Sequence, residues 1–189
     1  MPNLSLLKTR PELVGDDFVN WDQVQPGNQS VPVHQNDTFS SRSGLVTCTI
    51  ERPVNLRKEL QGSAGSTANW QGNFNPGDGV LVTDVTSNRK LRINFNPPIR
   101  GVGAQIQSTK IGSIGIKFTA SIKAFQDNGT VQGKQIGSRT RIGTSNSKND
   151  NSAIFVGLVD ATATISWIEF DVIAVPKNFA INGLEILTA

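Results

Sequence analysis

Residues 114–128 read IGIKFTASIKAFQDN, and their alternation decides the fold class of this chain. Apolar residues occupy the even positions from 114 to 124, and mostly polar residues occupy the odd ones. A period of two is typical of a strand with one buried face. Asp127-Asn128-Gly129 follows and predicts a tight hairpin turn, because Asn and Gly tolerate positive φ, and Thr130-Val131-Gln132 is expected to start the return strand.

A strand with one dry face needs a second layer over it, and the chain has almost no helical pattern, so we expect that layer to be another sheet. Working outward, residues 91–96 repeat the alternation, residues 153–159 form a continuous apolar run, and turn-forming dipeptides separate the segments. The sequence therefore predicts an all-β fold, a two-sheet antiparallel β-sandwich of the jelly-roll type found in carbohydrate-binding modules, with about ten strands.

The expected domain organisation is an N-terminal arm at residues 1–15 and a single β-sandwich domain at residues 16–189. Residues 56–78 and 137–152 lack an apolar period and are predicted to be loops. The parity of the apolar residues changes near Trp167, which predicts a β-bulge that lets both sets reach the interior.

Composition favours a folded strand-and-turn protein, with 37% hydrophobic and 17% charged residues. Cys48 is the single cysteine, so an intramolecular disulfide and a cysteine metal cluster are excluded, and we expect it in the core rather than as a nucleophile. No run approaches the ~20 apolar residues of a membrane span, and no signal peptide is visible at the start.

The net charge of +3 hides a strong asymmetry. Residues 1–88 carry six Lys or Arg against nine Asp or Glu, residues 89–148 carry eleven against Asp127 alone, and residues 149–189 carry one against five. The basic residues that could share one wet sheet face are Arg92, Lys117, Lys123, Lys134, Arg139 and Arg141. The alternative is a solvated face balanced by acidic loops. Nucleic acid is not expected as a partner, because aromatic residues between these charges are missing apart from Phe125.

A series of short motifs resembles a group of uncharacterised bacterial secreted proteins with a C-terminal sorting signal of the Pro-Glu-Pro type. The motifs are WQGNF at 70–74, PGD at 76–78, GVGAQIQ at 101–107, AF at 124–125, DNG at 127–129, SAIFVG at 152–157 and NFAIN at 178–182. The resemblance covers most of the chain from Asp17 onward and implies a carbohydrate-binding jelly roll at the cell surface or outside the cell. This chain departs from the group in showing neither leader nor sorting tail, so a cytoplasmic location stays open.

Four residues near the two ends are candidate metal ligands. If the first and last strands pair, their oxygens would lie close together, and clustered oxygens suit calcium, which we expect as a stabilising cofactor. The candidates are Asp16, Asp17, Asn182 and Glu185. The alternative for an Asp before a strand is a turn or backbone-capping role.

Catalytic motifs are missing from the sequence. His34 is the only histidine and has no serine or cysteine motif beside it. Glu169 and Asp171 are the residues that could act in an enzyme, because burial beside Trp167 would raise the pKa of either carboxyl and make a general acid. The simpler interpretation is two exposed acids between core residues.

Sugar contact is the remaining candidate, because sugars stack on aromatic rings while amides and carboxylates satisfy their hydroxyls. The candidate ligand-binding residues are Trp70, Gln71, Asn73, Asp78 and Trp21. The alternative for Trp70 is that its ring closes one end of the sandwich. The chain is thus predicted to be a non-catalytic binding module for a glycan or other polar polymer. The alternatives are a cyclase- or glycosidase-like enzyme of small molecules and a structural or assembly protein.

Overall fold

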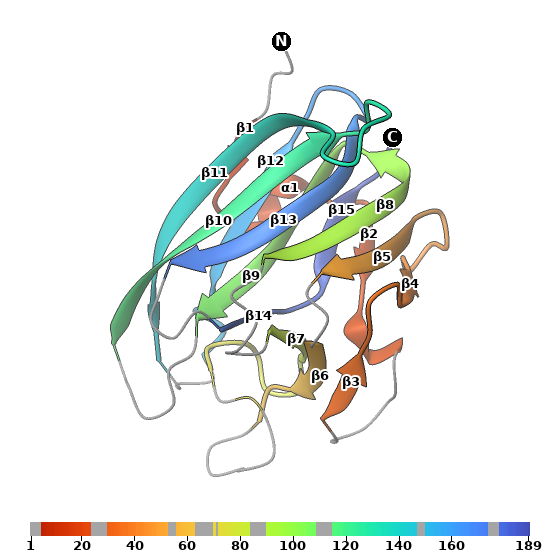
Figure 1. The fold of residues 1–189 in the computed structure, drawn as a ribbon. Coiled ribbons are helices and arrows are strands. Elements are labelled where there is room, and N and C mark those ends of the chain that lie inside the picture. The colour runs from red at the N-terminus through yellow and green to blue at the C-terminus, as the bar shows by residue number, and fades with distance from the viewer. Residues whose placement is uncertain are drawn as a thin grey trace.

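The computed structural model describes residues 5–23, 30–52, 56–62, 70, 72–83, 90–108, 115–146, 150–173 and 178–189. These residues form two antiparallel sheets that pack face to face (Figure 1). Nine strands make sheet A: β1 (Ser5–Leu7), β2 (Asp17–Val19), β3 (Val31–Val33), β6 (Leu56–Leu60), β7 (Gly79–Thr83), β9 (Gly101–Ser108), β12 (Ile154–Val159), β14 (Phe179–Ile181) and β15 (Leu184–Leu187). Six strands make sheet B: β4 (Thr38–Ser40), β5 (Thr47–Arg52), β8 (Leu91–Ile99), β10 (Ile116–Gln126), β11 (Lys134–Ser145) and β13 (Ile165–Ile173).

The predicted two-sheet antiparallel sandwich is confirmed, although the described residues contain fifteen strands rather than about ten. The only helices in the described residues are the one-turn α1 (Arg10–Leu13) and the 3-10 helix η1 (Trp21–Gln23). The order of strands is β1-β12-β9-β14-β7-β6-β3 in sheet A, with β15 between β9 and β2, and β11-β10-β13-β8-β5-β4 in sheet B. Within the described residues, no helix is long and apolar enough to cross a membrane.

The alternating segment forms β10, whose inward side chains Phe118, Ala120, Ile122 and Ala124 are buried in the core between the sheets. It pairs with β11 from Ile116↔Ser145 to Gln126↔Lys134. The turn is longer than predicted: Asp127 Oδ1 accepts the N–H of Gly129, Asn128 Oδ1 accepts that of Thr130, and the return strand starts only at Lys134. The hairpin is therefore correct in place but not in loop length.

Two segments that were predicted as loops contain strands. Residues 134–145 form β11, an edge strand that lacks an apolar period because its outward residues are mostly Ser and Thr and its inward ones include Arg139 and Arg141. Residues 56–60 form β6, in which fully buried Lys58 stands where a strand pattern would have an apolar residue. Both departures hide the period-two signal on which the sequence prediction depended.

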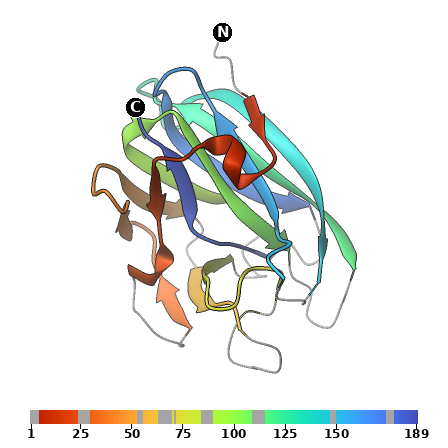
Figure 2. The same ribbon diagram turned by 180° about the vertical axis from the view of Figure 1, so that it is seen from behind.

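The two outer faces of the sandwich differ. The outer face of sheet A is covered in two places by apolar side chains from other segments. One cluster joins Trp70 and Phe74 to Val80, Val82, Ala153 and Ala180. The other joins Leu7 of β1 and Leu13 of α1 to Phe155 of β12, with Val159 and Leu187 against it. Residues 5–13 of the predicted arm are thus packed on sheet A, and Figure 2 shows α1 in front of that sheet.

Candidate functional site

The outer face of sheet B is a regular polar surface. Every second residue of its strands points to solvent, and most of these side chains are hydroxyls, amides or charged groups. No described helix or strand lies over it in Figure 1, and the turn at residues 127–133 packs only at one end. We call this surface the open face.

The strand registers arrange the side chains of the open face in rows. One row runs from Phe125 through Trp167 and Asn94 to Thr49. The next contains Ser138, Lys123, Glu169 and Arg92, and the one after it contains Thr140, Ser121 and Asp171. A further row places Thr119 between Ile142 and Ile173, and beyond it Lys117 lies opposite Thr144. The rows alternate regularly because the side chains of neighbouring antiparallel strands lie opposite one another.

Trp167 lies in the first row, between Phe125 and Asn94. Its ring stacks on Phe125 at 5.5 Å and 8°, and the guanidinium carbon of Arg92 lies 4.2 Å from its ring centre. The register of β13 against β8 shifts between Ile165 and Trp167, where a β-bulge was predicted. Of these two residues, Ile165 lies in the core between the sheets, and Trp167 lies on the outer side of sheet B. Trp167 is only 5% exposed, so its ring supports Arg92 and Phe125 and is not itself a surface for a ligand.

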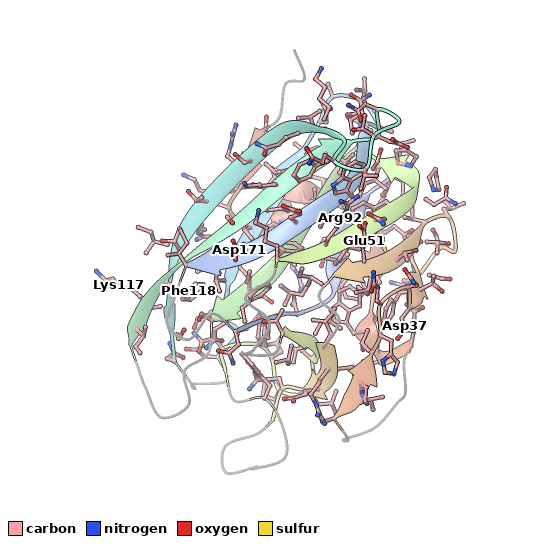
Figure 3. All side chains as sticks on the ribbon, viewed as in Figure 1. Asp37, Glu51, Arg92, Lys117, Phe118 and Asp171 are labelled. Carbon is pink, nitrogen blue, oxygen red and sulfur yellow. The ribbon has the colours of Figure 1, made fainter. Side chains whose placement is uncertain are left out.

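Charged groups on β5, β8 and β13 pair with one another. Arg92 Nε lies 2.6 Å from Glu51 Oε2, and that oxygen also accepts the side-chain amide of Asn94 at 2.9 Å. Figure 3 shows Arg92 and Glu51 together on this face. Lys90 Nζ lies 3.3 Å from Glu169 Oε2. The Arg92 group is held in one geometry by the ring beneath it and the carboxylate beside it.

The predicted catalytic acids therefore lie on the open face and not in an apolar pocket. Glu169 contacts Lys90, and Asp171 Oδ1 accepts the N–H of Val172 at 2.9 Å. His34 is exposed between β3 of sheet A and β4 of sheet B, where its backbone N–H donates to Asp37 Oδ2. Cys48 is buried in the core, as expected, and burial together with the nearby Asp17 charge raises the pKa of its thiol to about 12.

The predicted ligand-binding residues do not form an exposed aromatic lip. Trp21 is fully buried, packs edge-on against Phe39, and donates its Nε1–H to the Asn182 carbonyl at 2.8 Å. Trp70 is 6% exposed in the cluster that covers sheet A, and Asn73 beside it is 1% exposed.

Asp78 is half-buried, and burial raises the pKa of its carboxyl. Its Oδ2 accepts a hydrogen bond from the backbone N–H of Asn75, and this hydrogen bond acts to lower the pKa. Gln71 lies outside the described residues.

The predicted metal ligands are brought near one another but do not converge. Strands β2 and β15 do pair, which is the condition under which these residues were expected to be neighbours. Asp17 lies opposite Ile186 and points inward, whereas Glu185 lies opposite Phe18 and points outward. Each side chain already has protein partners: Asp16 accepts from Thr188, Asp17 from Ser43, Asn182 from Gln105, and Glu185 pairs with Arg10. These four residues do not fit a shared calcium ion, whose six to eight oxygens must face one point.

No group of three or more His, Cys, Asp or Glu residues suited to a metal is present in the described ranges.

Sequence reasoning placed Lys117, Lys123 and Arg92 correctly on the polar side of their strands but missed β11. The apolar period is hidden in β11, and the signal that remained was the Ser, Thr and Ile residues at every second position: Ser138, Thr140, Ile142 and Thr144.

Arg139 and Arg141 have the opposite parity and are not on the open face; Arg141 Nη1 donates to the Phe155 carbonyl of β12 at 2.8 Å.

No protein-family model matches the chain, and no curated protein or solved structure matches it either.

Proposed function

We propose that this protein is a non-catalytic binding module that holds a glycan against the open face of sheet B. The observation that carries the proposal is the contrast between the two outer faces: sheet A is covered by apolar clusters, while sheet B presents ordered rows of polar side chains. Hydroxyls such as Thr119, Ser121 and Thr140 can donate to and accept from sugar hydroxyls.

The shape of the surface favours a polymer over a small molecule. Small ligands are usually enclosed in a concave pocket that buries most of their surface. A broad sheet face instead makes many shallow contacts along an extended ligand, and Phe125, half-exposed at the end of the first row, offers one ring edge to it. The proposed binding site is therefore the open face of sheet B and not the residues around Trp70 that the sequence suggested. The proposal does not include calcium.

Affinity electrophoresis in native gels that contain soluble glycans tests this proposal. The panel should include hydroxyethylcellulose, carboxymethylcellulose, dextran, xylan and dextran sulfate. We expect at least one to retard the wild type relative to a non-binding reference protein. The double variant Thr119→Val/Thr140→Val removes two hydroxyls of the open face while keeping shape and strand propensity, and each lost hydrogen bond is expected to weaken binding about fivefold, or roughly 1 kcal/mol.

The matched control is Thr162→Val, because Thr162 is exposed in the turn that follows β12. Its retardation should equal that of the wild type, and thermal unfolding of all three proteins should show that they are folded. The proposal is wrong if no glycan retards the wild type, or if the double variant and the wild type are retarded equally by every glycan that binds.

A further inference from the structure

The charges of the open face are divided between its two halves. All its acidic side chains lie on β5 and β13, where Glu51 contacts Arg92 and Glu169 contacts Lys90. Strands β10 and β11 contain no Asp or Glu over their whole described length. The outward side chains of these strands up to the register shift at Ala124/Phe125, which we call the β10/β11 strip, are Lys117, Thr119, Ser121, Lys123, Ser138, Thr140, Ile142 and Thr144; beyond the shift lie Phe125, next to Trp167, and Gln135.

The cations of the strip are spaced along one strand. Lys117 and Lys123 are six residues apart on β10, which corresponds to about 20 Å of extended chain. Lys117 is exposed at one end of β10, as Figure 3 shows, and Lys123 is half-buried near the other. The hydroxyls of Thr119 and Ser121 lie between them. An extended polymer that follows β10 would therefore meet a cation, then hydroxyls, then a second cation.

The chain segment that contains the strip is basic, whereas the neighbouring strand β13 places Glu169, which Lys90 contacts, opposite Lys123 and Asp171 opposite Ser121. Residues 89–148 carry eleven Lys or Arg against one acid, Asp127, which lies in the turn beyond β10. Arg139 and Arg141 lie on the inner side of β11 and add their charge behind the strip. A surface of one sign attracts ligands of the other sign and raises their rate of association.

Apolar contacts in the strip suit a sugar better than a nucleic-acid base. Ile142 is 69% exposed and Ile173 is 71% exposed, one on each side of Thr119. Aliphatic side chains can contact the C–H groups of a sugar ring, whereas proteins that bind single-stranded nucleic acids stack bases on exposed aromatic rings. The β10/β11 strip as described has no exposed aromatic ring along β10 between Lys117 and Lys123.

We infer that the β10/β11 strip binds a glycan that carries carboxylate or sulfate groups, with Lys117 and Lys123 as the residues that contact the anions. This inference rests on the proposed function and names its ligand class. Thr119, Ser121 and Thr140 would contact the sugar hydroxyls between the charged groups. Because Lys117 and Lys123 are near the surface, the attraction weakens as salt screens it.

The test compares polymers that share a backbone and differ in charge: carboxymethylcellulose against hydroxyethylcellulose, and dextran sulfate against dextran. Dissociation constants are measured by affinity electrophoresis and calorimetry at low and at physiological salt. We expect the wild type to prefer at least one anionic polymer of these pairs, and Lys117→Gln/Lys123→Gln to weaken that binding on the order of tenfold at low salt. Lys117→Arg/Lys123→Arg should restore it.

The control variant Lys8→Gln/Arg57→Gln removes the same total charge from exposed positions beside and within sheet A. It should bind the anionic polymers as the wild type does. Equal loss in this control would overturn the inference, since binding would then follow net charge. Tighter binding of polyuridylate RNA than of any anionic glycan would also overturn it, in favour of nucleic acid.

The two proposals fail in different ways. If neutral polymers bind as tightly as anionic ones, and Thr119→Val/Thr140→Val weakens that binding while the lysine variants do not, the glycan-binding function stands and the anionic ligand is wrong. If no glycan of either kind binds, the proposed function is wrong and this inference falls with it.

Discussion

Asp17 shows how much one carboxylate organises at the rim of the sandwich. Its Oδ1 accepts the N–H of Phe18 at 2.9 Å and that of Ser43 at 3.0 Å, and its Oδ2 accepts the Ser43 hydroxyl. Burial acts to raise the pKa of Asp17, but hydrogen bonds from the side chains of Ser41 and Ser43 and from the two backbone N–H groups outweigh it, so the pKa lies below its usual value. The residue ties β2 to the turn before β5 in its charged form.

We expect Asp17→Asn to lower the free energy of unfolding by about 1–2 kcal/mol at neutral pH, because it replaces charge-assisted hydrogen bonds by neutral ones. Since the native pKa of Asp17 is depressed, the stabilisation is present above the unfolded pKa near 3.8 and is lost as pH falls through the native value. Urea unfolding as a function of pH should therefore show the two proteins converging in acid. Asp16→Asn, at an exposed position, is the control and should change stability less.

Gly133 is constrained by both its backbone and its neighbour. It has φ of +56°, and an added Cβ would lie 1.8 Å from Cη2 of Trp167. Gly133→Ala is expected to destabilise the fold by about 2–4 kcal/mol, from the left-handed backbone and the clash together. Gly129→Ala is a matched control, because Gly129 has φ of +76° with open space around it, and should cost only about 1 kcal/mol.

Adding Trp167→Phe to Gly133→Ala separates the two contributions. The smaller ring makes room for the methyl group, so the double variant should be less destabilised than the sum of the single variants. Chemical denaturation of the four proteins measures this coupling. Strict additivity would show that the ring does not press on residue 133.

Single residues also mark where the sequence was informative and where it was not. Lys117, Lys123 and Arg92 could be placed on the polar side of the sheet, because strand parity alone decides it. Trp21 and Trp70 could not be placed, since an indole among polar neighbours looks the same whether it contacts a ligand or packs against a distant strand. Buried Lys58 has Asp22 3.1 Å from its Nζ, a compensation that only the folded chain reveals.

At the scale of elements, β11 is an edge strand whose inner side carries arginines. Arg141 Nη1 donates to the carbonyls of Phe155 in β12 and of Lys8 just after β1, and so connects the edges of the two sheets. Inward-pointing charge at an edge strand also disfavours pairing with another chain. The place of the β10–β11 hairpin was predictable from the alternation in β10, but the extent of β11 was not, and the role of Arg141 depends on which strand of sheet A lies across the gap.

Arg141→Met is expected to loosen this connection without unfolding the core. Local opening of β1 should become easier by roughly 1–2 kcal/mol, because two hydrogen bonds from a charged donor are lost. Hydrogen exchange of the amides at residues 5–7 measures the effect. Lys134→Met removes the same charge from the exposed start of β11 and should leave that exchange unchanged; equal acceleration in both variants would contradict the expectation.

At the scale of the whole molecule, the two-layer architecture could be predicted from period-two patterns, whereas the pairing of β2 with β15 entered the sequence reasoning only as a condition. Which outer face is covered could not be predicted, because the covering residues come from short, aperiodic segments such as α1 and the chain around Phe74. Deletion of residues 1–14 tests the cover directly. It removes Leu7 and Leu13 and uncovers Phe155, so we expect about 3–5 kcal/mol of lost stability.

Calorimetric unfolding and gel filtration of the deletion variant check this expectation, with self-association of the uncovered face as a second sign. Glycan binding to sheet B should survive at temperatures where the variant is folded, because the open face is on the opposite side. An unchanged melting temperature would mean that the N-terminal segment adds nothing to the fold.

The position of β15 has a consequence for how the chain acquires its structure. Among the described strands, β2 pairs only with β15, and β15 connects it to β9. On the ribosome, residues 17–19 have no strand partner until residues 184–187 have been made, although Arg42 and Ser43 can already hydrogen-bond to them, so sheet A stays incomplete for most of the synthesis of the domain. Pairings so distant in sequence are slow to form, and the unfinished sheets expose apolar strands during that delay.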